Sequence, residues 1–407
     1  MSLAIRPTLS ALLRNRAGAL LVAVQTAITL AVLVNAVHIV YQRIEKMDRP
    51  TGVDEPNLFQ VSGSGFTPRF NAITALREDL AYLRSLPGVV DAAPGATVPL
   101  GDSNTSGVLS ADPNFKGPGH YISMYMTDEH GLNALGAHLI AGRNFRAEDI
   151  LPPINGWLQM KDFPHEVIVS QSAAAILFPG QSALGKIVYD QQQHAATIIG
   201  IMNDVISPAW FARYFPYAVM LVPLPQTFGG TGLLVRARPG ERDAVMRIVE
   251  QHLSTSNPDR VINWVTSLEH LKAVFYRDDR NLAIFLVAMT LLVLLITCIS
   301  IFGLATFNVN TRTKQIGTRR AVGARRADIV SYFMIENGLI TSGGIVAGCL
   351  LALAVGYWLS ERLELPRLDL YYLVGGVLVL WTIGQLAAWQ PARRASSVSP
   401  SVATRTV

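Results

Sequence analysis

Four uninterrupted apolar stretches constrain this chain more than any other feature of its sequence. None of them contains Asp, Glu, Lys or Arg, and each has about the 20 residues that an α-helix needs to cross a bilayer. The sequence therefore predicts an integral membrane protein, because no soluble fold requires four such runs. The predicted transmembrane helices are 17–41, 282–307, 338–359 and 370–389.

Charge composition and charge position support this class. Only 15% of the 407 residues are charged, against about 25% in an ordinary soluble domain. Half of the residues are hydrophobic and no fixed short repeat occurs, which excludes disordered, collagen-like and coiled-coil chains. Basic residues cluster before the first span, after the second and after the fourth. By the positive-inside rule, both termini and the 308–337 loop are cytoplasmic. The net charge of +5 thus follows from topology and does not indicate a nucleic-acid partner.

The long segment 42–281 is expected to form a large α+β extracytoplasmic domain inserted between the first and second spans. A strand–helix–strand pattern occurs near its start (57–99) and again near its end (230–267). The helices of these patterns are expected at Asn71–Leu86 and Glu241–Leu253. Residues 100–229 are richer in Gly, Pro and short strands and are expected to form an inserted subdomain.

The remaining segments connect these parts. Residues 1–16 predict an amphipathic helix at the inner membrane surface, and 390–407 a cytoplasmic tail. Residues 268–281 are amphipathic and run without a breaker into the second span. They form either a stiff stalk continuous with that span or an ordinary helix end packed on the outer domain, and the sequence favours neither.

The third span carries small residues at a spacing of four, which lets another helix approach closely. Its partner lies either within the protomer or across a dimer. The residues of this ridge are Gly344, Gly348, Ala352 and Gly356.

A P-loop-like segment, Gly180–Lys186, is rejected as a nucleotide site. Its eighth position is Ile187, which has no hydroxyl for Mg²⁺, and a strand rather than a helix is expected to follow. The histidines show no metal-ligand spacing. The sequence therefore indicates no cofactor and no metal.

A second catalytic candidate combines Ser103 with Asp162 and His165, in the manner of GDSL-type hydrolases. A nucleophilic serine needs a base within hydrogen-bond reach, but the oxyanion donors of those hydrolases have poor matches here. Turn residues are the better interpretation, so no catalytic residue is assigned. A membrane-anchored hydrolase remains the weakest of the alternatives.

The basic segment from Thr311 to Ile329 is the most specific motif in the chain. It resembles the FtsX-like permease family, the membrane subunits of MacB-type ABC systems. The matching residues are Arg312, Thr313, Ile316, Gly317, Arg319, Arg320, Ala321, Gly323, Ala324, Asp328, Ile329 and Glu336. Gln315 departs from the family pattern, which usually has Glu there. Residues 390–394 resemble the family's ending, and 141–145, 167–178, 184–186 and 198–205 resemble the MacB-type periplasmic core.

The resemblance implies a non-catalytic permease in the bacterial inner membrane. Such a subunit pairs with a cytoplasmic ABC ATPase and with a second permease protomer, as a homodimer or heterodimer, and leaves room for a periplasmic adaptor protein. It implies that the ATPase grips residues 311–329 and drives export or extraction of a substrate. As a hypothesis, Arg319, Arg320 and Arg325 anchor to acidic residues of the ATPase. A non-transporting subunit that regulates a periplasmic enzyme by mechanotransmission is the alternative.

Overall fold

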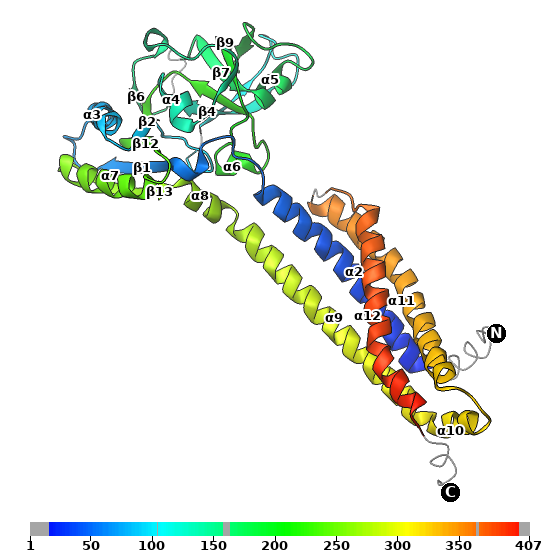
Figure 1. The fold of residues 1–407 in the computed structure, drawn as a ribbon. Helices are drawn as coiled ribbons and strands as arrows, with labels where there is room; N and C mark the ends of the chain where they lie inside the picture. Colours follow the sequence, from blue (N-terminus) through cyan, green and yellow to red (C-terminus); the bar gives the residue numbers. More distant parts are fainter. Residues whose placement is uncertain (1–15, 104, 158–162, 364–365, 399–407) are drawn as a thin grey trace. The chain divides into compact units, whose positions relative to one another are not determined.

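The computed structural model describes residues 16–103, 105–157, 163–363 and 366–398 (Figure 1). The described chain forms two compact units. We call residues up to Asp48 and from Asp278 onward the helical unit, and Arg49–Arg277 the mixed unit. The helix expected over 1–16 lies outside the described residues, except for Arg16.

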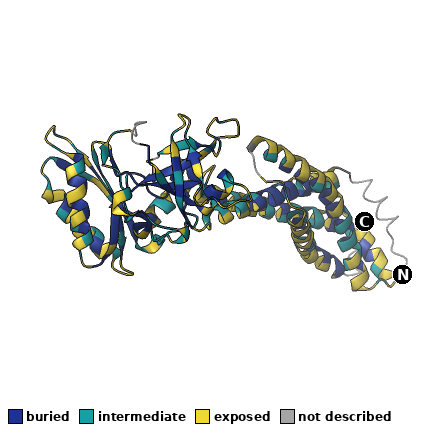
Figure 2. Cartoon of the chain, turned by 90° about the horizontal axis from the view of Figure 1, so that it is seen from above, coloured by how far each residue is buried: buried dark blue, intermediate teal, exposed yellow. Residues whose placement is uncertain are grey.

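The helical unit is built from long apolar helices. In the part of the chain that the structure describes, four helices are long and apolar enough to cross a membrane. They are α2 (Arg16–Met47), α9 (Arg277–Thr311), α11 (Arg326–Leu363) and α12 (Leu370–Ser396). Each extends beyond its apolar run, and most of the segment 308–337 that connects the second and third spans is helical. Figure 2 shows exposed residues along the outside of these helices, as expected of surfaces that meet lipid.

The small residues of α11 face α2. A Cβ atom added at Gly344 would lie 2.6 Å from the Ala23 carbonyl oxygen, and one at Gly348 would lie 3.0 Å from the Ala27 Cα atom. The two backbones approach closely because neither position carries a side chain. The ridge therefore packs within the protomer.

The same contact continues toward the far end of α11. Asn35 donates from Nδ2 to the carbonyl oxygen of Ala352 at 3.1 Å, and a Cβ atom at Gly356 would lie 3.1 Å from Asn35 Oδ1. On another side of α2, Thr29 Oγ1 lies 2.6 Å from Thr297 Oγ1 of α9. Asn35, Thr29 and Thr297 thus each have a hydrogen-bond partner in a region where water is scarce.

We predict that Gly344→Ala destabilises the helical unit by about 1–3 kcal/mol, because the added methyl group collides with backbone of α2. Gly343→Ala is the matched control, since a Cβ atom there meets no heavy atom within 4 Å. It should be neutral or slightly stabilising through helix propensity. Thermal unfolding of both variants in detergent measures the difference, and equal midpoints would contradict the packing assignment.

The first sheet of the mixed unit is antiparallel, in the order β13-β1-β12-β2. Its elements are β1 (Leu58–Gly65), α3 (Ala72–Ser85), β2 (Val89–Pro94), β12 (Gly230–Ala237), α7 (Arg242–Ser256) and β13 (Arg260–Ser267). In this order, strands from the start of the mixed unit (β1 and β2) alternate with strands from its end (β12 and β13). The two strand–helix–strand units therefore form a single sheet. Asn71 caps α3 by accepting from the Thr74 backbone N–H at 3.0 Å.

A buried ion pair lies among α3, α7 and β13. Arg260 donates to Asp79, and its other terminal nitrogen, Nη2, donates to the Leu253 carbonyl oxygen at 3.1 Å and to Ser256 Oγ at 3.0 Å. The side chains of Arg260 and Asp79 are 1% and 6% exposed. Burial raises the pKa of Asp79, and the guanidinium of Arg260 opposes that shift.

The second sheet runs in the order β3-β4-β10-β7-β9-β5, with β8 paired to β9. Its strands are β3 (Ser106–Leu109), β4 (His120–Met126), β5 (Leu139–Gly142), β7 (Glu166–Ser170), β8 (Ile187–Tyr189), β9 (Ala195–Met202) and β10 (Val219–Val222). The short strands β6 (Ile154–Asn155) and β11 (Gln226–Thr227) pair with each other and form a third, two-stranded sheet. The smaller helices are η1 (Glu55–Asn57), α4 (Gly131–Leu135), η2 (Ala147–Asp149), α5 (Gln171–Leu177) and α6 (Ala209–Ala212).

One apolar core joins the two sheets. Leu58, Ala93 and Leu234 of the first sheet share a cluster of buried side chains with Ile168 and Leu221 of the second. Figure 2 shows buried residues concentrated on the strands. The two sheets therefore share one buried cluster between them, in addition to a separate cluster on each sheet.

The helix that leaves the mixed unit is interrupted. α8 (Leu268–Phe275) begins at the Ser267 cap and ends before Tyr276, and α9 begins at Arg277. Tyr276 is buried, and its backbone lies outside helical geometry at φ −93° and ψ 7°. The segment expected over 268–281 is therefore helical on both sides of Tyr276 and interrupted at that one residue.

Candidate coupling site

The basic motif forms a helical corner between α9 and α11. α10 (Thr313–Ala321) follows directly on α9, and the chain reverses at Gly323, whose φ of +100° favours glycine. Asp328 then accepts from the Arg325 backbone N–H at 2.9 Å, which caps the start of α11. We call residues 312–336 the corner.

Apolar packing holds the inner side of the corner. Ile316 and Gly317 of α10 are buried, and Ala324 is partly buried against the same cluster. The cluster joins α9, α10, α11 and α12 through Val309, Ile316, Ile329, Phe333, Ala392 and Ala395. α10 is thus fixed against three of the long helices.

An ion pair ties the beginning of the corner to α11. Arg312 donates from Nη1 to Glu336 Oε2 at 2.8 Å and to the Tyr332 hydroxyl at 3.1 Å. The Glu336 side chain is 4% exposed, and that of Arg312 is 17% exposed. Because this ion pair is shielded from water, removing either partner would leave the other charge buried without compensation and would destabilise the folded chain.

The next two arginines also make contacts within the chain. The Arg319 guanidinium lies over the Tyr332 ring, 4.9 Å from its centroid. Arg320 donates from Nη1 to the carbonyl oxygens of Ser396 at 2.8 Å and Val398 at 3.1 Å. The first of these carbonyls is the last of α12 and the second lies just beyond it, where a cation also complements the helix dipole.

The outer side of the corner is exposed and basic. We call residues 321–326 the tip. Ala321, Val322, Gly323, Arg325 and Arg326 are exposed there, with 85% of Val322 accessible. The motif therefore divides into arginines that brace the corner, Arg312 and Arg320, and arginines that face outward at the tip.

Sequence reasoning missed Tyr332, which contacts both Arg312 and Arg319. A signal was present, because Tyr332 precedes Glu336 by four residues and so lies on the same face of α11. The contact between Arg320 and the end of α12 had no such signal, since it joins residues 76 positions apart.

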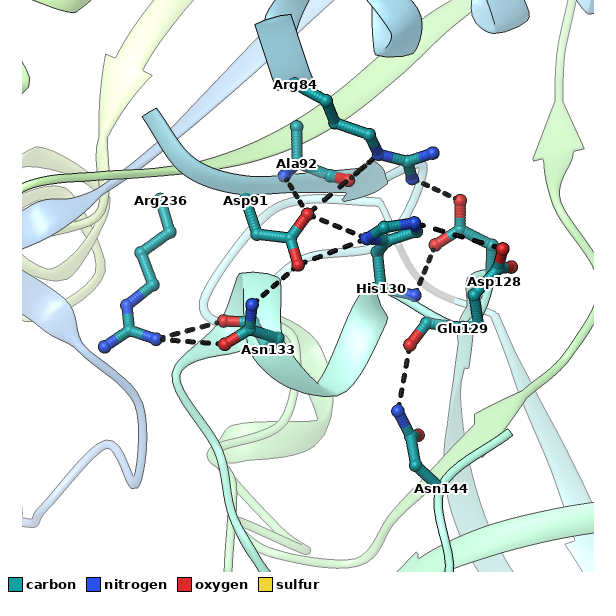
Figure 3. Close-up of polar contacts among 9 residues, drawn as sticks. All are labelled: Arg84, Asp91, Ala92, Asp128, Glu129, His130, Asn133, Asn144 and Arg236. Carbon is teal, nitrogen blue, oxygen red and sulfur yellow. Dashed lines mark hydrogen bonds and ion pairs between the residues drawn. The ribbon is translucent and has the colours of Figure 1, made fainter. Parts of the chain in front are cut away.

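A second polar site joins the two sheets of the mixed unit (Figure 3). Asp91 of β2 lies 2.9 Å from His130 Nδ1 through Oδ1 and accepts from Asn133 Nδ2 at 2.7 Å. Arg84 of α3 donates to the Ala92 carbonyl at 2.9 Å and to Asp128 Oδ2 at 2.5 Å.

Burial raises the pKa of Asp128, and the Arg84 guanidinium opposes that shift. Asp128 also accepts from the His130 backbone N–H at 3.0 Å, which orders the turn before α4. With its charges paired and its oxygens bonded, the site braces the joint between the sheets rather than presenting reactive groups.

The rejected catalytic candidates occupy loops. Gly180 and Gly185 have positive φ angles, and Lys186 is followed by the strand β8 rather than by a phosphate-binding helix. Ser103 is exposed between β2 and β3, and Asp162 lies outside the described residues. Among the described residues, no cluster of His, Cys, Asp and Glu has the arrangement of a metal site.

Two family models match the chain. The model of the MacB-like periplasmic core domain matches residues 19–252, and that of the FtsX-like permease C-terminal region matches residues 287–400. The second of these contains the corner.

Individual proteins are similar at a lower level. The macrolide export ATP-binding/permease protein MacB of Campylobacter jejuni is 25% identical over 83% of this chain and 51% of its own length. The uncharacterized ABC transporter permease YknZ of Bacillus subtilis is 27% identical over 58% of this chain and 61% of its own. The crystal structure of the periplasmic region of MacB from Actinobacillus actinomycetemcomitans aligns with 56% of this chain and 97% of its own, at 13% identity and a TM-score of 0.36. The chain spans about half the length of the MacB relative that it matches.

Proposed function

The chain belongs to the FtsX-like permeases with a MacB-like periplasmic core domain, and from this premise we propose that it couples ATP hydrolysis to movement of the mixed unit. In this proposal a cytoplasmic ABC ATPase, carried by a partner chain, supplies the energy. The permease itself performs no catalysis and binds no cofactor. The movement serves export or extraction of a substrate.

The observation that carries the proposal is the division of the corner into a braced side and an exposed tip. We propose that the ATPase docks on the tip, through Arg325 and Arg326. Arg312 and Arg320 then pass the displacement of α10 to α11 and α12, because each connects the corner to one of those helices. A rigid corner moves as one piece instead of deforming under the load.

The proposed orientation follows from charge. The tip and the end of α12, with Arg393 and Arg394, carry exposed basic residues, which favours the cytoplasmic side. The mixed unit, which lies between α2 and α9 in the chain, is then periplasmic. α9 has 17% of its most apolar window buried within the protomer, which leaves surface for lipid and for a second protomer.

We predict that Arg325→Glu combined with Arg326→Glu abolishes stimulation of the ATPase without altering folding. Reversed charges at an interface cost several kcal/mol, so the complex should weaken about a hundredfold or more. The test is co-purification in detergent with the ABC ATPase encoded nearest to this chain's gene, followed by an ATPase assay. Arg394→Glu is the control, because it reverses an exposed charge of the same unit outside the corner.

Two results would contradict parts of the proposal. If the variant with both Arg325→Glu and Arg326→Glu stimulated the ATPase fully, the tip would not be the docking surface. A wild-type chain that neither binds nor stimulates an ABC ATPase would remove the coupling function itself.

A further inference from the structure

An exposed group of aromatic side chains surrounds α6 in the mixed unit. Tyr121, Trp210, Tyr214 and Phe215 are exposed around the buried ring of Phe211. Trp210 and Tyr214 are 59% and 65% accessible. We call these four exposed residues, with Arg213, the α6 surface.

The rings form one connected surface. The Trp210 ring centroid lies 4.8 Å from that of Phe211 and 5.8 Å from that of Tyr214. Tyr121 stacks on Phe215 at 6.1 Å, and both approach Phe211. Large apolar side chains gathered in this way mark a surface that contacts a partner or a membrane.

The α6 surface is tied to the two places where the chain passes to the helical unit. The Tyr217 hydroxyl donates to the Pro50 carbonyl at 2.8 Å, two residues after Asp48. The Arg213 guanidinium lies 5.8 Å from the Phe275 ring centroid, two residues before α9 begins. These contacts place residues 209–217 beside Pro50 and Phe275. Both of those residues lie close in sequence to the points where the chain passes into the helical unit.

Charges and an aromatic residue on the helices mark the level of the lipid headgroups near those attachments. Arg43 and Lys46 of α2 pair with Asp279 of α9, and Tyr41, two residues before Arg43, is exposed. The apolar run of α9 begins at Leu282, five residues after α9 itself begins at Arg277, which is about 7.5 Å of helix. Since the headgroup layer is about 5–8 Å deep, the chain that leads from the mixed unit into α9 enters that layer within a few residues of Arg277.

A cavity of about 350 Å³ in this surface has the chemistry of a headgroup site. It is lined by Asp102, Ala209, Trp210, Arg213 and Tyr214. A guanidinium binds phosphate well, while a carboxylate and aromatic faces favour an ammonium group. Opposite charges beside aromatic rings therefore match a zwitterionic phospholipid such as phosphatidylethanolamine.

We propose that the α6 surface binds the zwitterionic headgroups of the leaflet next to the mixed unit. The aromatic rings lie at the boundary of that leaflet, and the Asp102–Arg213 cavity receives a headgroup. This inference rests on the helices spanning a membrane and not on coupling to an ATPase. Its failure therefore leaves the proposed function untouched.

The test measures the depth of a label on the full-length chain in nanodiscs. Cys298 and Cys349 are first replaced by Ala, and a bimane fluorophore is attached at Tyr121→Cys, outside the cavity. Phosphatidylethanolamine nanodiscs carry a nitroxide on a fraction of the headgroups. Ile187→Cys on β8 is the control, since Ile187 is 43% exposed and belongs to the β8–β9 pair, outside the α6 surface.

We expect the nitroxide to quench the label at position 121 several-fold more than the label at 187. Phe215→Cys repeats the measurement if the first variant does not fold. Equal quenching of the labels at positions 121 and 187 overturns the proposal. So does a label at 121 that is equally shielded from solvent in detergent and in nanodiscs, because protein rather than lipid would then cover it.

The zwitterionic preference has its own comparison. Quenching at 121 should fall about two-fold or more in phosphatidylglycerol nanodiscs, which lack the ammonium group, and Asp102→Asn should abolish that difference between lipids. Equal quenching in both lipids by the chain with Asp102 intact overturns the assignment of the cavity.

Discussion

Replacing Arg312 by Met should destabilise the helical unit by about 3–5 kcal/mol, because Glu336 would then be left buried without its charged partner. The same substitution removes the link between the start of the corner and α11. Stimulation of the ATPase should fall with it. Thermal unfolding in detergent measures the first effect, and the ATPase assay of the reconstituted complex measures the second.

A double-mutant cycle separates these two effects. Arg312→Met combined with Glu336→Leu removes both charges, so most of the lost stability should return. Coupling should stay low, since the bond between the corner and α11 is still absent. If the double variant regained full ATPase stimulation, the ion pair would serve folding alone.

Arg260→Met should have a similarly large effect on the mixed unit, about 3–5 kcal/mol at neutral pH. The substitution leaves Asp79 buried without the guanidinium that opposes the rise of its pKa. Between the ordinary pKa of an aspartate and the raised pKa of Asp79, the Asp79 carboxyl is protonated in the folded state and ionised in the unfolded state. Stability of this variant should therefore fall as the pH rises through that window.

The pH dependence provides the measurement. The difference in unfolding midpoint between Arg260→Met and wild type should be larger at pH 8 than at pH 5. Asp79→Leu combined with Arg260→Met is the control, because without the carboxyl group that pH dependence disappears. A pH-independent loss in the single variant would show that Asp79 does not take up a proton.

The local elements of the mixed unit are readable from sequence where one face of an element is apolar. The helix expected at Asn71–Leu86 is observed at Ala72–Ser85, because Asn71 is a strong cap and Leu76, Leu80 and Leu83 recur at helical spacing. The reversal after α10 follows in the same way from Gly323. Local chemistry decides each of these features.

Contacts between distant segments are not readable in this way. The α11 ridge predicts close packing, but its partner, α2, emerges only when both helices are in place. The role of Arg320 depends on where α12 ends, and that end is set by tertiary packing. The corner was therefore predictable as a basic helical segment, whereas its division into bracing and outward-facing arginines was not.

The common interior of the two sheets limits how this chain can be recombined with others. Excising residues 100–229 as a module would strip the cover from Leu58, Ala93 and Leu234, whose burial depends on side chains of that insert. Chimaeras that exchange only the insert should therefore lose solubility or structure. A graft with its junctions near Arg49 and Arg277 carries the whole interior with it, so diversification by recombination is confined to exchange of the complete unit or to its surface loops.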